Sequence, residues 1–118
     1  MKSTFAYLRI IDTDPDRESL LKNTLIDLAK MFNLALKCTY IDIEDSGDDT
    51  NRPALNDLLT IIREEIGLGE QPTVLIIAPC HLSWESSVRR RIESEIIDAG
   101  ARLVSAWKNH EIGADFYP

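Results

Sequence analysis

The segment from Thr73 to Ala78 constrains the fold more than any other part of the sequence. It reads TVLIIA, an apolar run without a single charged residue. A strand with one solvated face alternates apolar and polar side chains, whereas a strand covered on both faces is apolar throughout. The run therefore predicts a central strand of a sheet that has helices packed on both sides.

The flanking chain alternates strand patterns with helix patterns. Strands are predicted over residues 4–11, 34–42 and 101–107, and helices over residues 15–33, 53–67 and 83–99. Pro15 and Pro53 stand at first helical positions, and Gly100 stands at a helix C-terminus. This β-α-β-α-β-α-β order with short connections predicts an α/β domain of three layers: a mostly parallel, four- to five-stranded sheet with helices on both faces.

The second predicted strand has a regular period of two. Its alternate positions are expected on one side of the sheet: Leu34, Leu36, Cys38, Tyr40 and Asp42. Ligand sites in such sheets lie at the carboxyl ends of the strands. Acidic residues gather there after the first and second strands, and we interpret them as a solvated rim rather than a metal site.

Length, net charge and cysteine count exclude several classes of protein. The 118 residues fit one domain, and the formal net charge of −7 argues against binding to nucleic acid or an anionic membrane by this chain alone. Two cysteines, Cys38 and Cys80, are too few for a disulfide scaffold and are expected to be reduced, partly buried thiols. No stretch approaches the ~20 apolar residues of a membrane span. We expect a cytoplasmic protein without a membrane partner.

The common cofactor and metal motifs are missing. Neither GxGxxG nor GxxxxGK[ST] occurs in the sequence. Cys80 and His81 are adjacent on a predicted strand end, where neighbouring side chains point apart, so they form neither a metal pair nor a nucleophile–base pair. No cofactor and no metal are predicted. An enzyme that uses Cys80 in other chemistry stays open, and would need a thiol of depressed pKa.

Four motifs together resemble one known family. They are YLRII at 7–11, D-x-x-x-S-G from Asp42 followed by RPAL at 52–55, CHLSW at 80–84 after the apolar strand, and GARLVS at 100–105. They resemble Y-x-R-V-S, D-x-x-x-S-G…R-P-x-L, D-R-L-S-R and G-v-x-l-v-S of the serine recombinases, the resolvase and invertase family. The chain is similar to the N-terminal catalytic domain of that family over essentially its whole length.

The resemblance implies a catalytic residue set from which most members are gone. In the family, a serine hydroxyl attacks a DNA phosphodiester, and arginines stabilise the charge that develops on phosphorus. The serine position is Ile11 here, and the three charged positions of D-R-L-S-R are Cys80, His81 and Trp84. Without a nucleophile the covalent route is closed. The chain is therefore expected to be a pseudoenzyme with no catalytic residues.

The resemblance also implies a domain organisation for this chain. Family members continue into a long dimerisation helix and a C-terminal DNA-binding region. We expect residues 1–118 to be a single resolvase-like domain that lacks both, so direct DNA binding by this chain alone is not expected.

The predicted function is that of a protein-interaction or regulatory module, linked to DNA recombination or transcription, with a protein partner or self-association. Trp84 and Trp107 are the candidate partner-surface residues, since tryptophan is enriched at interfaces. Trp84 could equally pack into the core. The basic run from Arg89 to Arg91 is interpreted as a solvated helix face with countercharge from nearby glutamates such as Glu93.

The alternative function is a small phosphate or nucleotide sensor. Its residual anion pocket would consist of Arg9, Ser46 and Arg52. In the competing interpretation both arginines pair with Asp42, Glu44 or Asp45 and only orient the loop between the second strand and the second helix.

Overall fold

Three helices and five strands alternate along the chain. The computed structural model describes residues 3–10, 15–43, 52–77, 82, 86–105 and 110–112. The strands are β1 (Thr4–Ile10), β2 (Leu36–Ile43), β3 (Thr73–Ile76), β4 (Arg102–Ser105) and β5 (His110–Ile112), and the helices are α1 (Pro15–Met31), α2 (Pro53–Gly67) and α3 (Ser86–Asp98). No helix in this part of the chain is long and apolar enough to cross a membrane.

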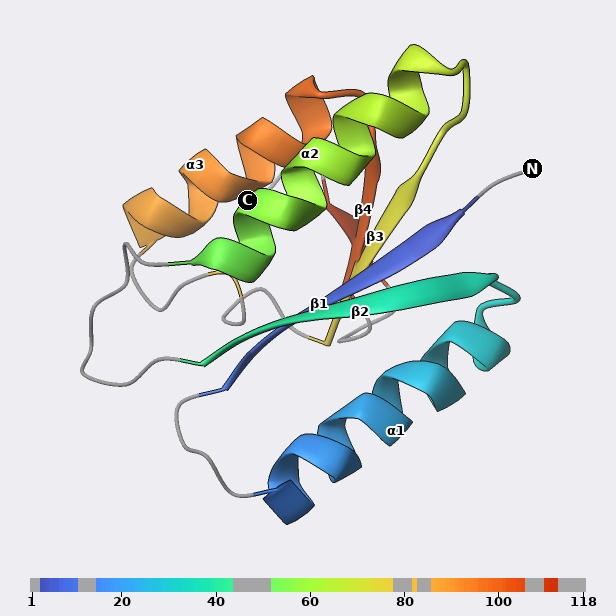
Figure 1. The fold of residues 1–118 in the computed structure, drawn as a ribbon, viewed down its shortest axis with the longest axis vertical. Coiled ribbons are helices and arrows are strands. Elements are labelled where there is room, and N and C mark those ends of the chain that lie inside the picture. The colour runs from blue at the N-terminus through green and yellow to red at the C-terminus, as the bar shows by residue number, and fades with distance from the viewer. Residues whose placement is uncertain are drawn as a thin grey trace.

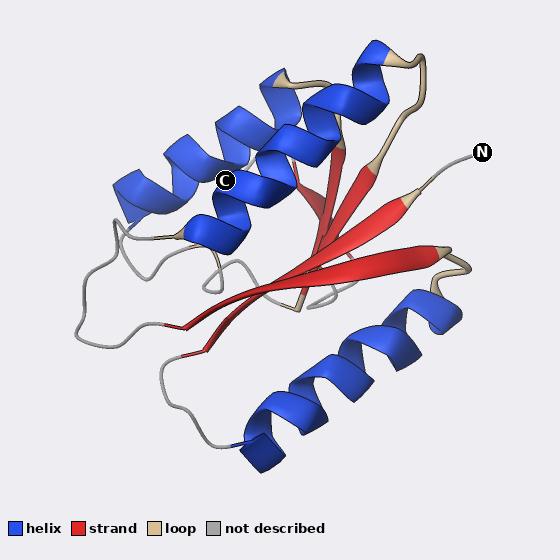
Figure 2. Ribbon diagram, viewed as in Figure 1, coloured by secondary structure: helices blue, strands red, loops and turns tan. Residues whose placement is uncertain are grey.

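The five strands form one sheet in the order β2-β1-β3-β4-β5. The first four are parallel to one another, and β5 is antiparallel to β4. Helix α1 covers one face, while α2 and α3 cover the other, so the molecule has three layers (Figures 1 and 2). The predicted fold class is confirmed. Strand β5 was not predicted, because its three residues, HEI, carry no apolar period.

Strand β1 is buried along its whole length, which explains why its sequence alternates poorly. Phe5 and Tyr7 belong to a core cluster with α2 and α3. Ala6, Leu8 and Ile10 belong to a second cluster with Leu25 and Ala29 of α1. Strand β3 is divided in the same way, with Val74 and Ile76 on the α2 side and Leu75 on the α1 side. The central strand is therefore covered on both faces, as its composition predicts.

Strand β2 departs from the regular alternation that its sequence predicts. Thr4 is aligned with Leu36, whereas Phe5 is aligned with Cys38, so Lys37 is an extra residue opposite β1. Because one extra residue moves everything before it to the other face, Leu36 packs with the α1-side cluster and Tyr40 with the α2-side cluster. The prediction of one continuous side from Leu34 to Asp42 is wrong. Cys38, expected to be partly buried, is exposed.

Gly100 ends the third helix in a conformation that other residues avoid. Its φ is +107°, and a Cβ atom there would lie 3.0 Å from Cδ1 of Ile66. We expect Gly100→Ala to lower the free energy of unfolding by about 1–2 kcal/mol, measured by urea denaturation. Gly67 is the matched control, since an added Cβ meets nothing within 4 Å. Equal effects of the two substitutions would contradict the assignment of strain to Gly100.

Candidate functional site

The carboxyl ends of β1, β2 and β3 define the candidate site. Strand order reverses between β1 and β3, because the chain winds from β1 to β2 in one direction and from β3 to β4 in the other. Crevices at such a reversal are the usual ligand sites of open parallel sheets. Near the carboxyl ends of the strands, Arg9 of β1 is aligned with Asp42 of β2. Both side chains are buried.

Asp42 joins three elements through its carboxylate. Its Oδ2 accepts a hydrogen bond of 2.8 Å from the hydroxyl of Tyr7, and a second of 3.0 Å from the backbone N–H of Leu55. Its Oδ1 accepts 2.8 Å from the backbone N–H of Ala54. The first N–H groups of a helix have no partner inside the helix. Asp42 therefore caps α2 from the neighbouring strand, a task that the Arg52 side chain at the N-cap position does not perform.

Tyr7 is held in its neutral form by this arrangement. Its side chain is fully buried. Burial, followed by the hydrogen bond to Asp42 and the charge of that carboxylate, raises the pKa of Tyr7 far above its usual value, and Arg52 offsets only part of the rise. A buried phenol that donates to a carboxylate loses both its solvation and its acceptor when it ionises. The hydroxyl is thus a fixed donor and not an acid or base at neutral pH.

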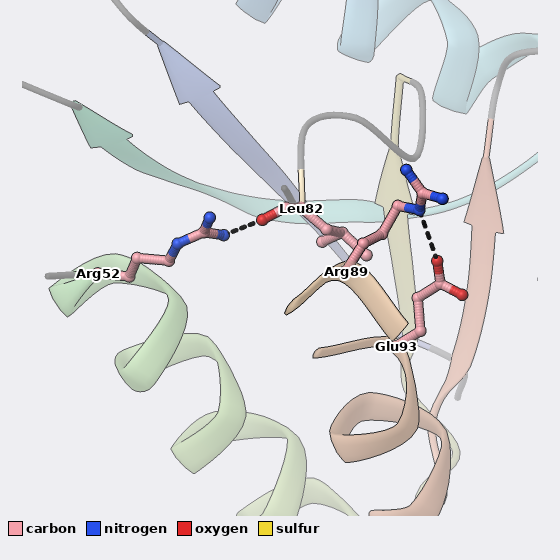
Figure 3. A network of polar contacts seen from close by, with 4 residues as sticks. All are labelled: Arg52, Leu82, Arg89 and Glu93. Carbon is pink, nitrogen blue, oxygen red and sulfur yellow. Dashed lines mark hydrogen bonds and ion pairs between the residues drawn. The ribbon is translucent and has the colours of Figure 1, made fainter. Parts of the chain in front are cut away.

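Arg9 and Arg52 are both buried, with exposed fractions of 8% and 5%. From the start of α2, the Arg52 guanidinium donates a hydrogen bond to the backbone carbonyl of Leu82 (Figure 3). Leu82 lies between β3 and α3, and its side chain is also fully buried. One function of Arg52 is therefore to tie the connection after β3 to the start of α2.

The second polar contact in Figure 3 lies within α3. Nε of Arg89 is 3.7 Å from Oε1 of Glu93, one helical turn away. The Glu93 side chain is only 6% exposed, whereas that of Arg89 is 28% exposed. The expected countercharge from Glu93 is confirmed, but the pair is not a solvated surface pair. Arg90 and Arg91 are exposed, as the predicted helix face requires.

The comparison with solved structures identifies the fold. No protein-family model matches the sequence, and no curated protein resembles it significantly. Among solved structures, it is similar to the N-terminal catalytic domain of TP901-1 integrase, with a TM-score of 0.69, 19% identity, and coverage of 92% of this chain and 80% of the other. It is also similar to the C-terminal catalytic domain of ISC1926 TnpA, an IS607-like serine recombinase, with a TM-score of 0.71, 21% identity, and coverage of 88% and 69%.

A third similar structure is a resolvase family site-specific recombinase from Streptococcus pneumoniae. Its TM-score is 0.70 at 17% identity, with coverage of 98% of this chain and 78% of the other. The first of these neighbours is the catalytic domain of an integrase, and the other two are a serine recombinase and a resolvase family recombinase. The fold is that of a serine recombinase catalytic domain. Fold does not fix activity, so the function of this resolvase-like domain is argued from its site.

The resolvase-like domain brings two of the three predicted anion-pocket residues to one edge of its sheet, Arg9 and Arg52. The other residues singled out from the sequence lie outside the described residues: Ile11, Ser46, Cys80, His81, Trp84 and Trp107. Within the described ranges, no three histidine, cysteine or acidic side chains come together to hold a metal ion.

Sequence reasoning missed the roles of three residues in this domain. Tyr7 and Asp42 appear in the recognised motifs, yet their bond depends on strand register, which only the paired structure supplies. The sequence did hold one signal, the period of two along β1. Tyr7 and Arg9 are two residues apart, so their side chains lie on the same face of the sheet, the face that α2 covers. Glu93 was taken for a solvated charge, because a helical glutamate just after a run of arginines is typical of an exposed helix face.

Proposed function

We propose that this resolvase-like domain is non-catalytic and acts through protein contact in a complex linked to DNA recombination or transcription. The fold supports a role linked to DNA recombination, since its structural neighbours are integrase and recombinase domains. The resemblance of YLRII to Y-x-R-V-S puts Ile11, a side chain with no nucleophilic atom, at the position of the attacking serine. The proposed mechanism of action is therefore recognition.

The observation that carries this proposal is that buried polar side chains near the strand ends form hydrogen bonds within the protein. Asp42 accepts hydrogen bonds from Tyr7 and from two amides of α2, and Arg52 donates to the Leu82 carbonyl. These contacts join β1, β2, α2 and the connection after β3. A set of buried polar side chains engaged in this way stabilises the fold of a recombinase domain without requiring a reaction there.

A DNA-cleavage assay tests the catalytic half of the proposal. The purified chain is incubated with supercoiled and linear DNA, and products are separated under denaturing conditions with an active serine recombinase as the positive control. Neither strand breaks nor a covalent protein–DNA adduct is expected from the wild type. Ile11→Ser is expected to stay inactive, because Cys80, His81 and Trp84 still replace the charged positions of D-R-L-S-R. An adduct formed by the wild-type chain would refute the proposal.

A pull-down from the native host's lysate tests the interaction half. Wild type and Trp84→Ala are compared by quantitative mass spectrometry. We expect a specific protein that the wild type retains and Trp84→Ala retains poorly, because interface tryptophans carry a large share of binding energy. Equal retention by both variants would remove Trp84 from the partner surface, and no retained protein would refute the interaction function.

A second candidate function is supported by the burial of two arginines, Arg9, which is aligned with Asp42, and Arg52 at the start of α2. We propose it as the alternative: a sensor of phosphate or nucleotide at these two arginines and Ser46. An anion present at about 100 times its Kd stabilises the folded state by about 2.7 kcal/mol. Thermal denaturation with phosphate, sulfate and nucleotides, against chloride at equal ionic strength, should then show a rise in Tm. A Tm that responds to ionic strength alone would reject this candidate.

A further inference from the structure

Among the described strands, β2 forms the edge of the sheet opposite β5. It is eight residues long, and β1 is its only partner in that part of the chain. Within the described residues, no backbone hydrogen bond joins its outer edge to any other segment. An edge strand presents a row of backbone donors and acceptors that can pair with an added strand. From Cys38 to Ile43 the strand has one charged residue, Asp42, and that side chain is buried beneath α2.

Helix α2, beside this edge, carries an acidic stripe that consists of Asp57, Glu64 and Glu65. These residues lie on one side of the helix, with the apolar Ile61 between them. Glu65 faces β2, because its Oε1 is 3.8 Å from Nζ of Lys37. Asp57 and Glu64 are exposed and lie on the side of α2 that carries Ile61, which packs against the same core cluster as Tyr40 of β2. Their position agrees with the raised pKa of Tyr40, to which their charges contribute after burial and Cys38. Within the described residues, neither Asp57 nor Glu64 takes part in an ion pair.

We propose that the outer edge of β2 accepts an extended, basic segment of a partner protein as an added strand of the sheet. Backbone hydrogen bonds along residues 38–43 would supply the pairing, and the carboxylates of Asp57 and Glu64 would select lysine or arginine side chains on the α2 face. This inference rests on the proposed function as a protein-interaction module, and it names the chemistry of the partner.

Charge disfavours a second copy of this chain as the occupant. Two β2 edges paired antiparallel about a twofold axis place both copies of α2 on the same face of the joined sheet. The stripe on each α2 faces its own β2, so Asp57 and Glu64 of the two copies would approach one another across the axis. Like charges brought together at an interface oppose association. A basic segment meets the same carboxylates with opposite charge.

Peptide binding tests the proposal with the full chain. The probe is a fluorescent peptide of about ten residues in which lysine alternates with threonine and valine, a length that matches one strand. A matched peptide carries glutamate for lysine, and a third keeps the lysines but has every second backbone nitrogen methylated. We expect saturable binding of the lysine peptide alone, with backbone amide shifts in ¹⁵N NMR spectra confined to residues 37–43 and their neighbours. Equal binding of the N-methylated peptide would overturn the proposal, because strand pairing requires those N–H groups.

Charge reversal provides the matched variants. Asp57→Lys/Glu64→Lys is expected to weaken binding of the lysine peptide by about tenfold or more at low salt. Asp27→Lys/Glu95→Lys changes the net charge equally at exposed positions of α1 and α3, and is expected to leave binding within about twofold. Equal weakening by both pairs would reduce the effect to net charge and refute the site. Sedimentation that shows a dimer abolished by Thr39→Lys would instead assign the edge to a second copy.

The outcome separates this inference from the proposed function. If the lysine peptide fails to bind while the pull-down retains a partner sensitive to Trp84→Ala, the domain is an interaction module and its β2 edge is not the docking site. If the pull-down retains nothing and the peptide also fails, both the function and the edge are rejected.

Discussion

Replacing Asp42 with alanine is expected to lower the free energy of unfolding by about 3–5 kcal/mol. The substitution removes the acceptor of three hydrogen bonds, from Tyr7 and from the amides of Ala54 and Leu55. A hydrogen bond to a charged group contributes about 1.5–3 kcal/mol, and the loss of a helix cap costs about 1 kcal/mol. Because the three bonds share one carboxylate, their contributions are not additive, and the total is smaller than their sum. The Tyr7 hydroxyl, which has no solvent access, is left without this acceptor. Urea denaturation measures the change.

Two comparisons make the Asp42 result specific. Asp57→Ala, at an exposed carboxylate of α2, the helix that Asp42 caps, should change stability by no more than about 0.5 kcal/mol. In a double-mutant cycle, Tyr7→Phe and Asp42→Ala should be less than additive by about 1 kcal/mol or more, because both remove the same bond. Additive effects, or an Asp42→Ala loss as small as that of Asp57→Ala, would contradict the role of Asp42 as a shared acceptor.

The stability of the protein is expected to fall with pH above about 10 because of Tyr7. Its folded pKa lies far above the usual value of 10.0, so below pH 10 the phenol is protonated in both states and the contribution is fully present. Above that pH, the unfolded chain releases the proton while the folded chain keeps it. Unfolding then releases a proton, and its free energy falls by about 1.4 kcal/mol per pH unit. The contribution is lost completely only when pH passes the folded pKa.

Tyr7→Phe isolates this titration from that of the other alkaline groups. The stability difference between wild type and variant should shrink by about 2 kcal/mol between about pH 9 and about pH 11.5, measured by urea denaturation at each pH. Tyr40, whose pKa is raised mainly by burial, is present in both proteins and cancels from the comparison. Parallel pH profiles of the two proteins would show that Tyr7 titrates in the folded state as it does in the unfolded chain.

Much of the fold could be predicted from local patterns. The uninterrupted apolar run of β3 requires cover on both faces, and Pro15 and Pro53 correctly mark the starts of α1 and α2. These signals are local, since they depend on one segment's own period and caps. The third helix was predicted to end at residue 99, and Gly100 has the positive φ that its place at a helix end predicts.

What could not be predicted depends on partners that are distant in the sequence. The extra residue at Lys37 is defined only relative to β1, and β5 exists only through its pairing with β4. The contacts of Asp42 likewise bring together residues that are 35 and 13 positions apart. In the candidate site, sequence patterns identified Arg9 and Arg52 but not the Leu82 carbonyl that Arg52 binds, because a backbone acceptor carries no residue signature.

The place of β1 in the middle of the sheet has a consequence for synthesis on the ribosome. The first strand to emerge can pair with β2 once residues 36–43 are made, but its other edge stays open until residues 73–76 arrive. Throughout the intervening synthesis, a nascent chain that has already made α2 holds a mostly apolar strand, TFAYLRI, with one edge unpaired. Such edges are sites of aggregation. A pause in translation between α2 and β3 should therefore reduce the yield of native protein more than a pause of equal length after β4.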